Sequence, residues 1–320
     1  MKEKLRPTTQ WLAISLPPAE QVVAVELVAS GATFDVTSNI AVAAMRPFTL
    51  RLGLDPALSA ALSGTPAPLL RLVDRELSRT IGLMQLKLAG TWETAGARLG
   101  LFEVESAVHR CASWPRRAWD SWMYERAVRN VPRESLLMNP TAVEQMLAFY
   151  LRPRPVFLVS VDDGEHSNIF PMDLVGPMPP DHFTLALRTT SPSVETIKRA
   201  RRVAMADLPG AACRIAYQLG AHHKRSQIDW KQLPFKIARS PEFGLPIPEL
   251  ALRVREVEIL DYKTIGSHCL FVGQVRSETV LGEDVADGER GRLCHTSGAN
   301  QLLRTRYKRP FREALAPETT

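Results

Sequence analysis

Cysteine is scarce in this chain, and its four cysteines lie far apart. Cys111, Cys213, Cys269 and Cys294 form no CxxC pair, so their spacing indicates neither a zinc knuckle nor a dithiol redox centre. Isolated cysteines in a chain of this size are typical of a reducing compartment, where they act as small buried hydrophobic residues. The sequence therefore favours a cytoplasmic protein over a secreted one that is held together by disulfides.

Long apolar runs are lacking as well. No stretch of the sequence approaches the roughly 20 consecutive apolar residues that a membrane-spanning helix needs. The first seven residues are charged and lack the apolar segment of a secretory signal peptide. We therefore expect no membrane partner.

The positive charge is not gathered on one face. The net charge is +6, and the densest basic runs are residues 198–202 and 304–309. A groove for a nucleic-acid strand interleaves basic and aromatic side chains, and the chain shows no such face. Nucleic-acid binding through the basic charge is therefore the weakest of three functional hypotheses, and we expect no nucleic-acid partner.

The pattern of apolar residues favours strands. The chain has 24 prolines and 18 glycines, which interrupt its elements. Strands are expected at 11–16, 22–28, 48–54, 81–88, 99–104, 155–161, 183–187, 203–206, 250–260, 268–275 and 292–294. Helices are expected at 69–77, 116–130, 139–150, 192–200 and 211–219. Many strands with a few helices predict a mainly β protein with helices (α+β), as a closed or split β-barrel. The length predicts two domains, and we place their division between residues 1–138 and 139–320.

The start of one predicted helix has the properties of an anion site. A strand ends at Arg188, and residues 189–193 read Thr-Thr-Ser-Pro-Ser, with Ser191 as the expected N-cap and Pro192 in the first helical position. The first turn of a helix has free N–H groups and the positive end of the helix dipole. Arg188 can hold a phosphate through two hydrogen bonds. The alternative is a capped helix that carries a surface arginine.

The stretch that begins at Asn168 is apolar but irregular. Pro171, Gly176 and Pro177 interrupt it, and because proline removes a ladder donor this is not a regular central strand. Its backbone groups could meet the edge of a planar heterocycle, with Asn168 and Asp173 adding polar contacts. A bulged edge strand is the alternative.

Four segments in order resemble the flavin reductase-like family. They are residues 154–161 (Arg-Pro-Val-Phe-Leu-Val-Ser-Val), the loop led by Asn168, residues 188–195, and residues 266–275 (Gly-Ser-His-Cys-Leu-Phe-Val-Gly-Gln-Val). The resemblance covers residues 150–310 and implies an FMN-binding split β-barrel, which a strand-rich N-terminal domain with helices precedes.

The resemblance also implies the site residues. The residues that would line the flavin ring and ribityl chain are Asn168, Phe170, Pro171, Met172, Asp173 and Leu174. Those that would hold the phosphate are Arg188, Thr189, Thr190, Ser191 and Ser193. A further basic contact would come from Lys224 or Arg225, and His268 matches a histidine near the flavin face. His268 or His223 is the candidate proton donor, because imidazole titrates near neutrality. The histidines show no metal-ligand spacing, so we expect no metal.

By the same resemblance the protein would be an FMN-dependent oxidoreductase of the NAD(P)H:flavin reductase type. NADH or NADPH would be the electron donor, and a homodimer is expected because neighbouring subunits often complete the pocket in this family. It would reduce flavin for a partner oxygenase or reduce a small organic substrate. The alternative is a split barrel that binds FMN or another ligand without turnover. One departure is His-Thr-Ser-Gly-Ala-Asn at 295–300, where the family has an aromatic residue after the glycine.

The N-terminal half carries fewer signals. The strand order around 34–40 and 48–54 faintly echoes that of the second half, so one interpretation is a degenerate barrel without a flavin site. Trp114, Trp119, Trp122 and Tyr124 form an aromatic cluster. This cluster has three interpretations: packing against the barrel or a second subunit, a lid over the flavin, or a separate partner site.

Overall fold

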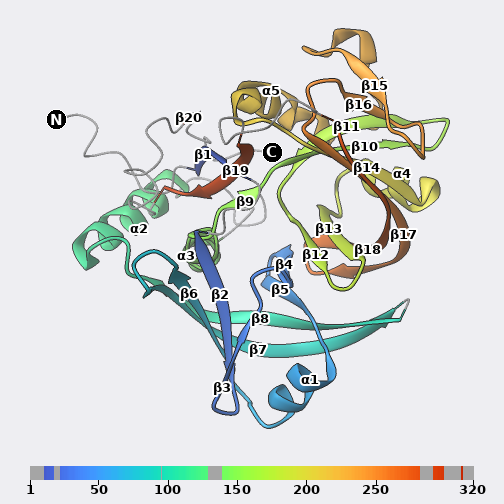
Figure 1. Ribbon diagram of the computed structural model, residues 1–320. Coiled ribbons are helices and arrows are strands. Elements are labelled where there is room, and N and C mark those ends of the chain that lie inside the picture. Colours follow the sequence, from blue (N-terminus) through green and yellow to red (C-terminus); the bar gives the residue numbers. More distant parts are fainter. Residues whose placement is uncertain are drawn as a thin grey trace.

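The computed structural model describes residues 11–17, 22–94, 96–128, 139–281, 291–298 and 311–312. These residues form mostly strands, with five α-helices, and the predicted mainly β fold class with helices is confirmed. Two seven-stranded antiparallel sheets make up most of the molecule (Figure 1). Both sheets keep two open edges, as a split barrel does and a closed barrel does not. No helix among the described residues is long and apolar enough to cross a membrane.

The N-terminal sheet has the strand order β3-β2-β6-β7-β8-β5-β4. Its strands are β2 (Val23–Ala29), β3 (Ala32–Asp35), β4 (Ile40–Met45), β5 (Phe48–Gly53), β6 (Leu69–Asp74), β7 (Arg79–Thr94) and β8 (Ala97–His109). Helix α1 (Pro56–Ser63) follows β5. Helix α3 (Pro140–Phe149) packs on this sheet, and Gln145 Nε2 donates to the carbonyl of Val104 at 2.6 Å.

The C-terminal sheet has the order β11-β10-β14-β17-β18-β13-β12. Its strands are β10 (Phe157–Asp162), β11 (Ser167–Met172), β12 (Val175–Met178), β13 (His182–Arg188), β14 (Arg202–Asp207), β17 (Arg253–Ile265) and β18 (His268–Val280). Helix α4 (Ser193–Ala200) follows β13. The connection from β14 to β17 holds α5 (Cys213–Gln218), the 3₁₀-helices η2 (Gly210–Ala212), η3 (Leu219–Lys224) and η4 (Trp230–Gln232), and a hairpin of β15 (Ile237–Arg239) and β16 (Pro246–Pro248).

A third sheet joins the two ends of the chain. Its order is β20-β1-β19-β9, in which β1 (Trp11–Leu16) pairs with β19 (Arg292–Ser297) and β19 pairs with β9 (Arg154–Pro155). The remaining strand is β20 (Phe311–Arg312). The first strand thus lies against the C-terminal part, whereas α3 contributes Met146 and Phe149 to the core of the N-terminal sheet. These contacts cross the expected boundary at residue 138, so the division into two domains stays a prediction.

One predicted element is wrong in type. Residues 69–77 were expected to be helical, but Leu69–Asp74 is strand β6, between β2 and β7. Its burial alternates, with Leu70, Leu72 and Asp74 facing the core. A period of two is the pattern of a strand, and a short run of leucines alone does not separate it from a helix.

Candidate functional site

The predicted phosphate-binding residues lie at the C-terminal end of β13, which is the strand next to the edge strand β12 of the C-terminal sheet. Arg188 ends β13 and lies opposite His268 in β18. The Thr189 N–H donates to the carbonyl of Ser267 at 3.1 Å, which fixes the loop to the turn before β18. The side chains of Thr189 and Thr190 are exposed. A cation and two accessible hydroxyls therefore lie just before the N-terminus of α4, as an anion site requires.

Ser191 does not cap α4 as the sequence predicted. The N-cap position belongs to Pro192, which has αR geometry and no side-chain cap hydrogen bond. The Ser191 hydroxyl instead donates to the carbonyl of His223 at 2.9 Å. This bond ties η3 to the start of α4, a long-range contact that a local capping rule does not anticipate.

Asn168 and Ser193 lie beneath this loop and are both fully buried. Asn168 Nδ2 lies within hydrogen-bond distance of Ser193 Oγ (3.0 Å), the His222 carbonyl (2.9 Å) and the Arg225 carbonyl (2.8 Å). One amide thus holds together β11, α4 and the end of η3. The contact of Asn168 and Ser193 with a cofactor stays a prediction, and their geometry favours a positioning role.

The residues predicted to line the flavin ring differ in accessibility. Phe170 and Met172 are buried, whereas Pro171, Asp173 and Leu174 are partly exposed. His223 Nε2 lies 2.6 Å from the Pro171 carbonyl, and its ring centroid lies 5.0 Å from that of Phe170. His223 therefore fixes the backbone of β11 from the side of η3. Lys224, the next residue, is exposed at the end of η3.

His268 is a buried histidine beside two other predicted site residues. Burial, and then the positive charges of Arg188 and His223, lower the pKa of His268 to about 4. Its Nδ1 lies 2.8 Å from Ser267 Oγ and 3.4 Å from the backbone N of Met45, in the N-terminal sheet. His268 is therefore neutral at pH 7, and any proton it gives there would be that of a neutral imidazole. Its catalytic role stays a prediction.

A second polar cluster, which was not predicted from the sequence, includes Asp173 in the connection between β11 and β12. Asp173 Oδ2 lies 3.1 Å from His295 Nδ1, and His295 Nε2 lies 2.9 Å from the Tyr217 hydroxyl. Burial acts to raise the pKa of Asp173, but its hydrogen bond with His295, with the charges of His295 and Arg154, holds that pKa below its usual value. His295 opens the segment that departs from the family motif, and this departure was the available signal.

Arg154 holds the connection between β11 and β12 in place. It is buried, and it donates from Nε to the Asp173 carbonyl at 3.1 Å and from Nη2 to the Val175 carbonyl at 2.6 Å. A buried arginine that binds two successive parts of one loop fixes the loop's path. A charged residue at the head of an apolar run was the sequence signal for this role.

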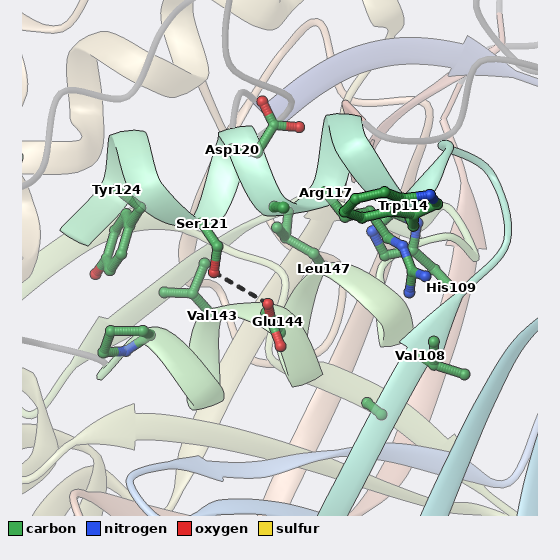
Figure 2. A pocket seen from close by; sticks show the side chains of 13 residues that line it. Val108, His109, Trp114, Arg117, Asp120, Ser121, Tyr124, Val143, Glu144 and Leu147 are labelled. Atoms are coloured by element: carbon green, nitrogen blue, oxygen red, sulfur yellow. Dashed lines mark hydrogen bonds between the residues drawn. The ribbon is translucent and has the colours of Figure 1, made fainter. Parts of the chain in front are cut away.

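The aromatic cluster lies elsewhere in the molecule. Helix α2 (Trp114–Val128) and α4 stand on opposite sides of the view in Figure 1, so α2 does not cover the start of α4. Between α2, α3 and β8 is a pocket of about 190 Å³, in which Ser121 donates to Glu144 at 3.1 Å (Figure 2). Trp114 is 74% exposed and Trp122 is 47% exposed. These tryptophans are therefore not part of the chain's own core, and their role as a lid over a flavin or as a separate partner site stays a prediction.

Comparison with known proteins gives a family match in the same region. Residues 149–296 match the family model described as flavin reductase like domain, and this range runs from the end of α3 into β19. No curated protein sequence matches the chain.

Solved structures of similar proteins align with about half of the chain. An FMN-binding protein from Thermus thermophilus with bound p-hydroxybenzaldehyde is 25% identical, with 54% of this chain and 92% of that chain covered and a TM-score of 0.41. An NADH:FAD oxidoreductase from Streptomyces globisporus is 18% identical, with 54% and 92% covered and a TM-score of 0.42. The flavin reductase component of a bacterial two-component tryptophan halogenase is 18% identical, with 48% and 92% covered and a TM-score of 0.40.

Proposed function

Residues 149–296 form a flavin reductase-like domain, and from this premise we propose that the domain binds FMN and transfers hydride to it from NADH or NADPH. The observation that carries the proposal is the start of α4. Arg188, the accessible hydroxyls of Thr189 and Thr190, and the helix N-terminus come together at one strand end. These groups fit a phosphate, because they combine a planar cation with oriented donors.

The chain's own residues would bind and orient rather than react. A bound flavin supplies the hydride acceptor at its N5 atom. Arg188 would hold the phosphate, and the partly exposed backbone from Pro171 to Leu174 would border the ring. Asn168 and His223 keep that backbone in place through the hydrogen bonds described above. His268 would contribute a neutral, buried surface beside the phosphate loop.

The electron acceptor after flavin is either a small organic substrate or the flavin pool of a partner oxygenase. Two of the aligned proteins are named as a reductase component of a halogenase and as an NADH:FAD oxidoreductase, and a comparable role is part of this proposal. The four cysteines are all free thiols, which supports a reducing, cytoplasmic setting.

A non-catalytic FMN protein is the second candidate. The observation that favours it is the Asp173, His295 and Tyr217 cluster, because His295 opens the segment 295–300, which departs from the motif that the family resemblance implies. A changed wall alters the path by which a nicotinamide would approach.

The two candidates separate in one anaerobic experiment. The purified protein is loaded with FMN, its visible spectrum is recorded, and NADH or NADPH is added. Bleaching of the flavin bands by either nucleotide supports the reductase. Bleaching by dithionite alone supports the non-catalytic protein, and failure to retain any FMN refutes both.

A further inference from the structure

The two large sheets share one topology. The strands of the two sheets correspond one to one in chain order. With this correspondence, the strand order of the N-terminal sheet is identical to that of the C-terminal sheet. The N-terminal strands β2, β3, β4, β5, β6, β7 and β8 correspond to β10, β11, β12, β13, β14, β17 and β18, respectively. The helix after β5 has its counterpart after β13, since α1 and α4 occupy the same place in the order. Seven strands in one order, with a helix at the same step, indicate two copies of one fold.

Two short sequence matches between the sheets lie at equivalent positions of the strand pairing. Phe-Thr-Leu-Arg-Leu at 48–52 matches Phe-Thr-Leu-Ala-Leu at 183–187, and Leu-Phe occurs at both 101–102 and 270–271. Leu50 lies opposite Phe102 in the first sheet, and Leu185 lies opposite Phe271 in the second. The matching residues therefore occupy equivalent positions in the two sheets, as expected of an internal duplication.

The two copies also face each other through equivalent parts. Strand β4 contacts its own counterpart β12, and it also contacts β13 and β18. The reciprocal contact is present, because Met178 of β12 packs with Leu99 of β8. The equivalent leucines Leu101 and Leu270 share one buried cluster. Reciprocal contacts of this kind define an isologous interface, the type found between the subunits of a two-fold dimer.

Only the C-terminal copy retains the features of an anion site. When the two Phe-Thr-Leu strands are aligned, Gly53 stands in the place of Arg188. Asp55 precedes Pro56 before α1 as Ser191 precedes Pro192 before α4, with an offset of one residue. The Asp55 carboxylate accepts from the Leu58 N–H at 2.7 Å and caps α1. A negative charge at that helix start opposes a phosphate.

The N-terminal copy also lacks the segment that carries His223. Strands β6 and β7 are joined between Asp74 and Arg79 by a short turn, whereas β14 and β17 are joined by residues 208–252. The N-terminal sheet therefore has neither the cation of the site nor the η3 residues that fix it.

Arg51 shows that the two copies are now complementary rather than identical. Its guanidinium is fully buried and donates to the Gly176 carbonyl at 2.6 Å, the Pro177 carbonyl at 2.9 Å and Thr184 Oγ1 at 2.7 Å. Burial lowers its pKa to about 9, so it stays charged at pH 7. The equivalent residue in the other copy is Ala186, so the contact made by Arg51 has no mirror-related counterpart at that position and is specific to this pairing.

A direct path links the N-terminal copy to the candidate phosphate loop. The Arg46 carbonyl, in the turn between β4 and β5, accepts from the Ser267 N–H at 2.9 Å. The Ser267 carbonyl in turn accepts from the Thr189 N–H at 3.1 Å. Gly266 allows this approach, because a Cβ at that position would lie 2.1 Å from the Arg46 carbonyl oxygen.

We propose that the N-terminal sheet is a built-in partner subunit. One chain then contains both halves of a pseudo-dimer, carries a single FMN site in its C-terminal sheet, and uses the turn between β4 and β5 to position the phosphate-binding loop. The FMN part of this inference rests on the proposed function, whereas the built-in partner does not. It replaces the homodimer that the family resemblance implied.

The first test is mass and stoichiometry, measured on the full-length protein by light scattering and by FMN titration. We expect a monomer of 35.6 kDa that binds one FMN. A dimer of twice that mass, or two FMN per chain, would overturn the inference. A chain that binds no FMN would refute the proposed function, and its mass would still decide whether the partner is built in.

The second test compares two glycines at equivalent hairpin turns. Gly266→Ala forces the Arg46 carbonyl away, whereas Gly96→Ala places its Cβ in open space. Both glycines have positive φ (52° and 78°), so the two alanine substitutions add similar backbone strain. We expect Gly266→Ala to raise the Kd for FMN about tenfold and to leave the Kd for riboflavin, which lacks the phosphate, unchanged. Gly96→Ala should change neither.

Equal FMN affinity in the two variants, or equal losses for FMN and riboflavin, would refute the positioning role. If Gly266→Ala does not fold, Pro47→Gly offers a milder change. It loosens the exposed turn that carries Arg46 without adding an atom, and the same selective loss of FMN over riboflavin is expected.

Discussion

Arg188 is the residue on which the phosphate assignment depends most. Replacing it with alanine removes the guanidinium at the end of β13 and leaves the ladder to β18 intact, because that ladder uses backbone atoms. Hydrogen bonds to a charged group contribute about 1.5–3 kcal/mol. The Kd for FMN should therefore rise about 10- to 150-fold, whereas the Kd for riboflavin should stay the same.

The matched control is Arg202→Ala. Arg202 is exposed at the start of β14, beyond the C-terminal end of α4. Its replacement therefore removes the same charge, but at a position distant from the proposed phosphate site. Fluorescence titration measures both affinities. A second readout follows from His268, whose pKa is lowered first by burial and then by Arg188; NMR titration should show this pKa higher in Arg188→Ala. Unchanged FMN affinity in Arg188→Ala, or an equal loss in Arg202→Ala, would refute the assignment.

Two further predictions concern stability. Asn168→Ala should lower the free energy of unfolding by about 1–3 kcal/mol, because the buried acceptors on Ser193, His222 and Arg225 lose their donor; urea unfolding measures this, and a change within error would contradict the positioning role. Stability should also fall as the pH drops from 6.5 towards 4. Burial first, and then nearby arginine charge, lower the pKa values of His109 and His268 from 6.5 to about 4, so the unfolded chain binds protons that the folded chain does not. Urea unfolding at pH 7 and pH 5 should show this loss, and His268→Gln should reduce it; an equal loss in the variant would count against His268.

Local signals predicted local structure well. Asn139 and Pro140 were expected to open a helix, and Asn139 Oδ1 accepts from the Ala142 N–H at 2.7 Å at the start of α3. The alternating strand expected at 250–260 falls largely within β17, and β17 forms the longest hairpin of the C-terminal sheet with β18, the strand expected at 268–275. Capping and alternation depend on neighbouring residues, which the sequence displays directly.

Contacts between distant segments were beyond such reasoning. The bond from Ser191 to His223 and the pair of Asp173 with His295 join residues far apart in the chain. The internal duplication that we infer left only a weak signal in the sequence. Two short sequence matches support it, and their common register is evident only from the strand pairing. The basic run at 304–309 and the residues Ala299 and Asn300 lie outside the described residues.

The central claim is a single FMN site in the C-terminal sheet of one chain. Titration of FMN into the cofactor-free protein, with the flavin signal followed to saturation and the protein mass measured in the same solution, tests it most directly. We expect saturation at one FMN per chain of 35.6 kDa. Absence of saturable binding, or saturation at two FMN per chain, would contradict it.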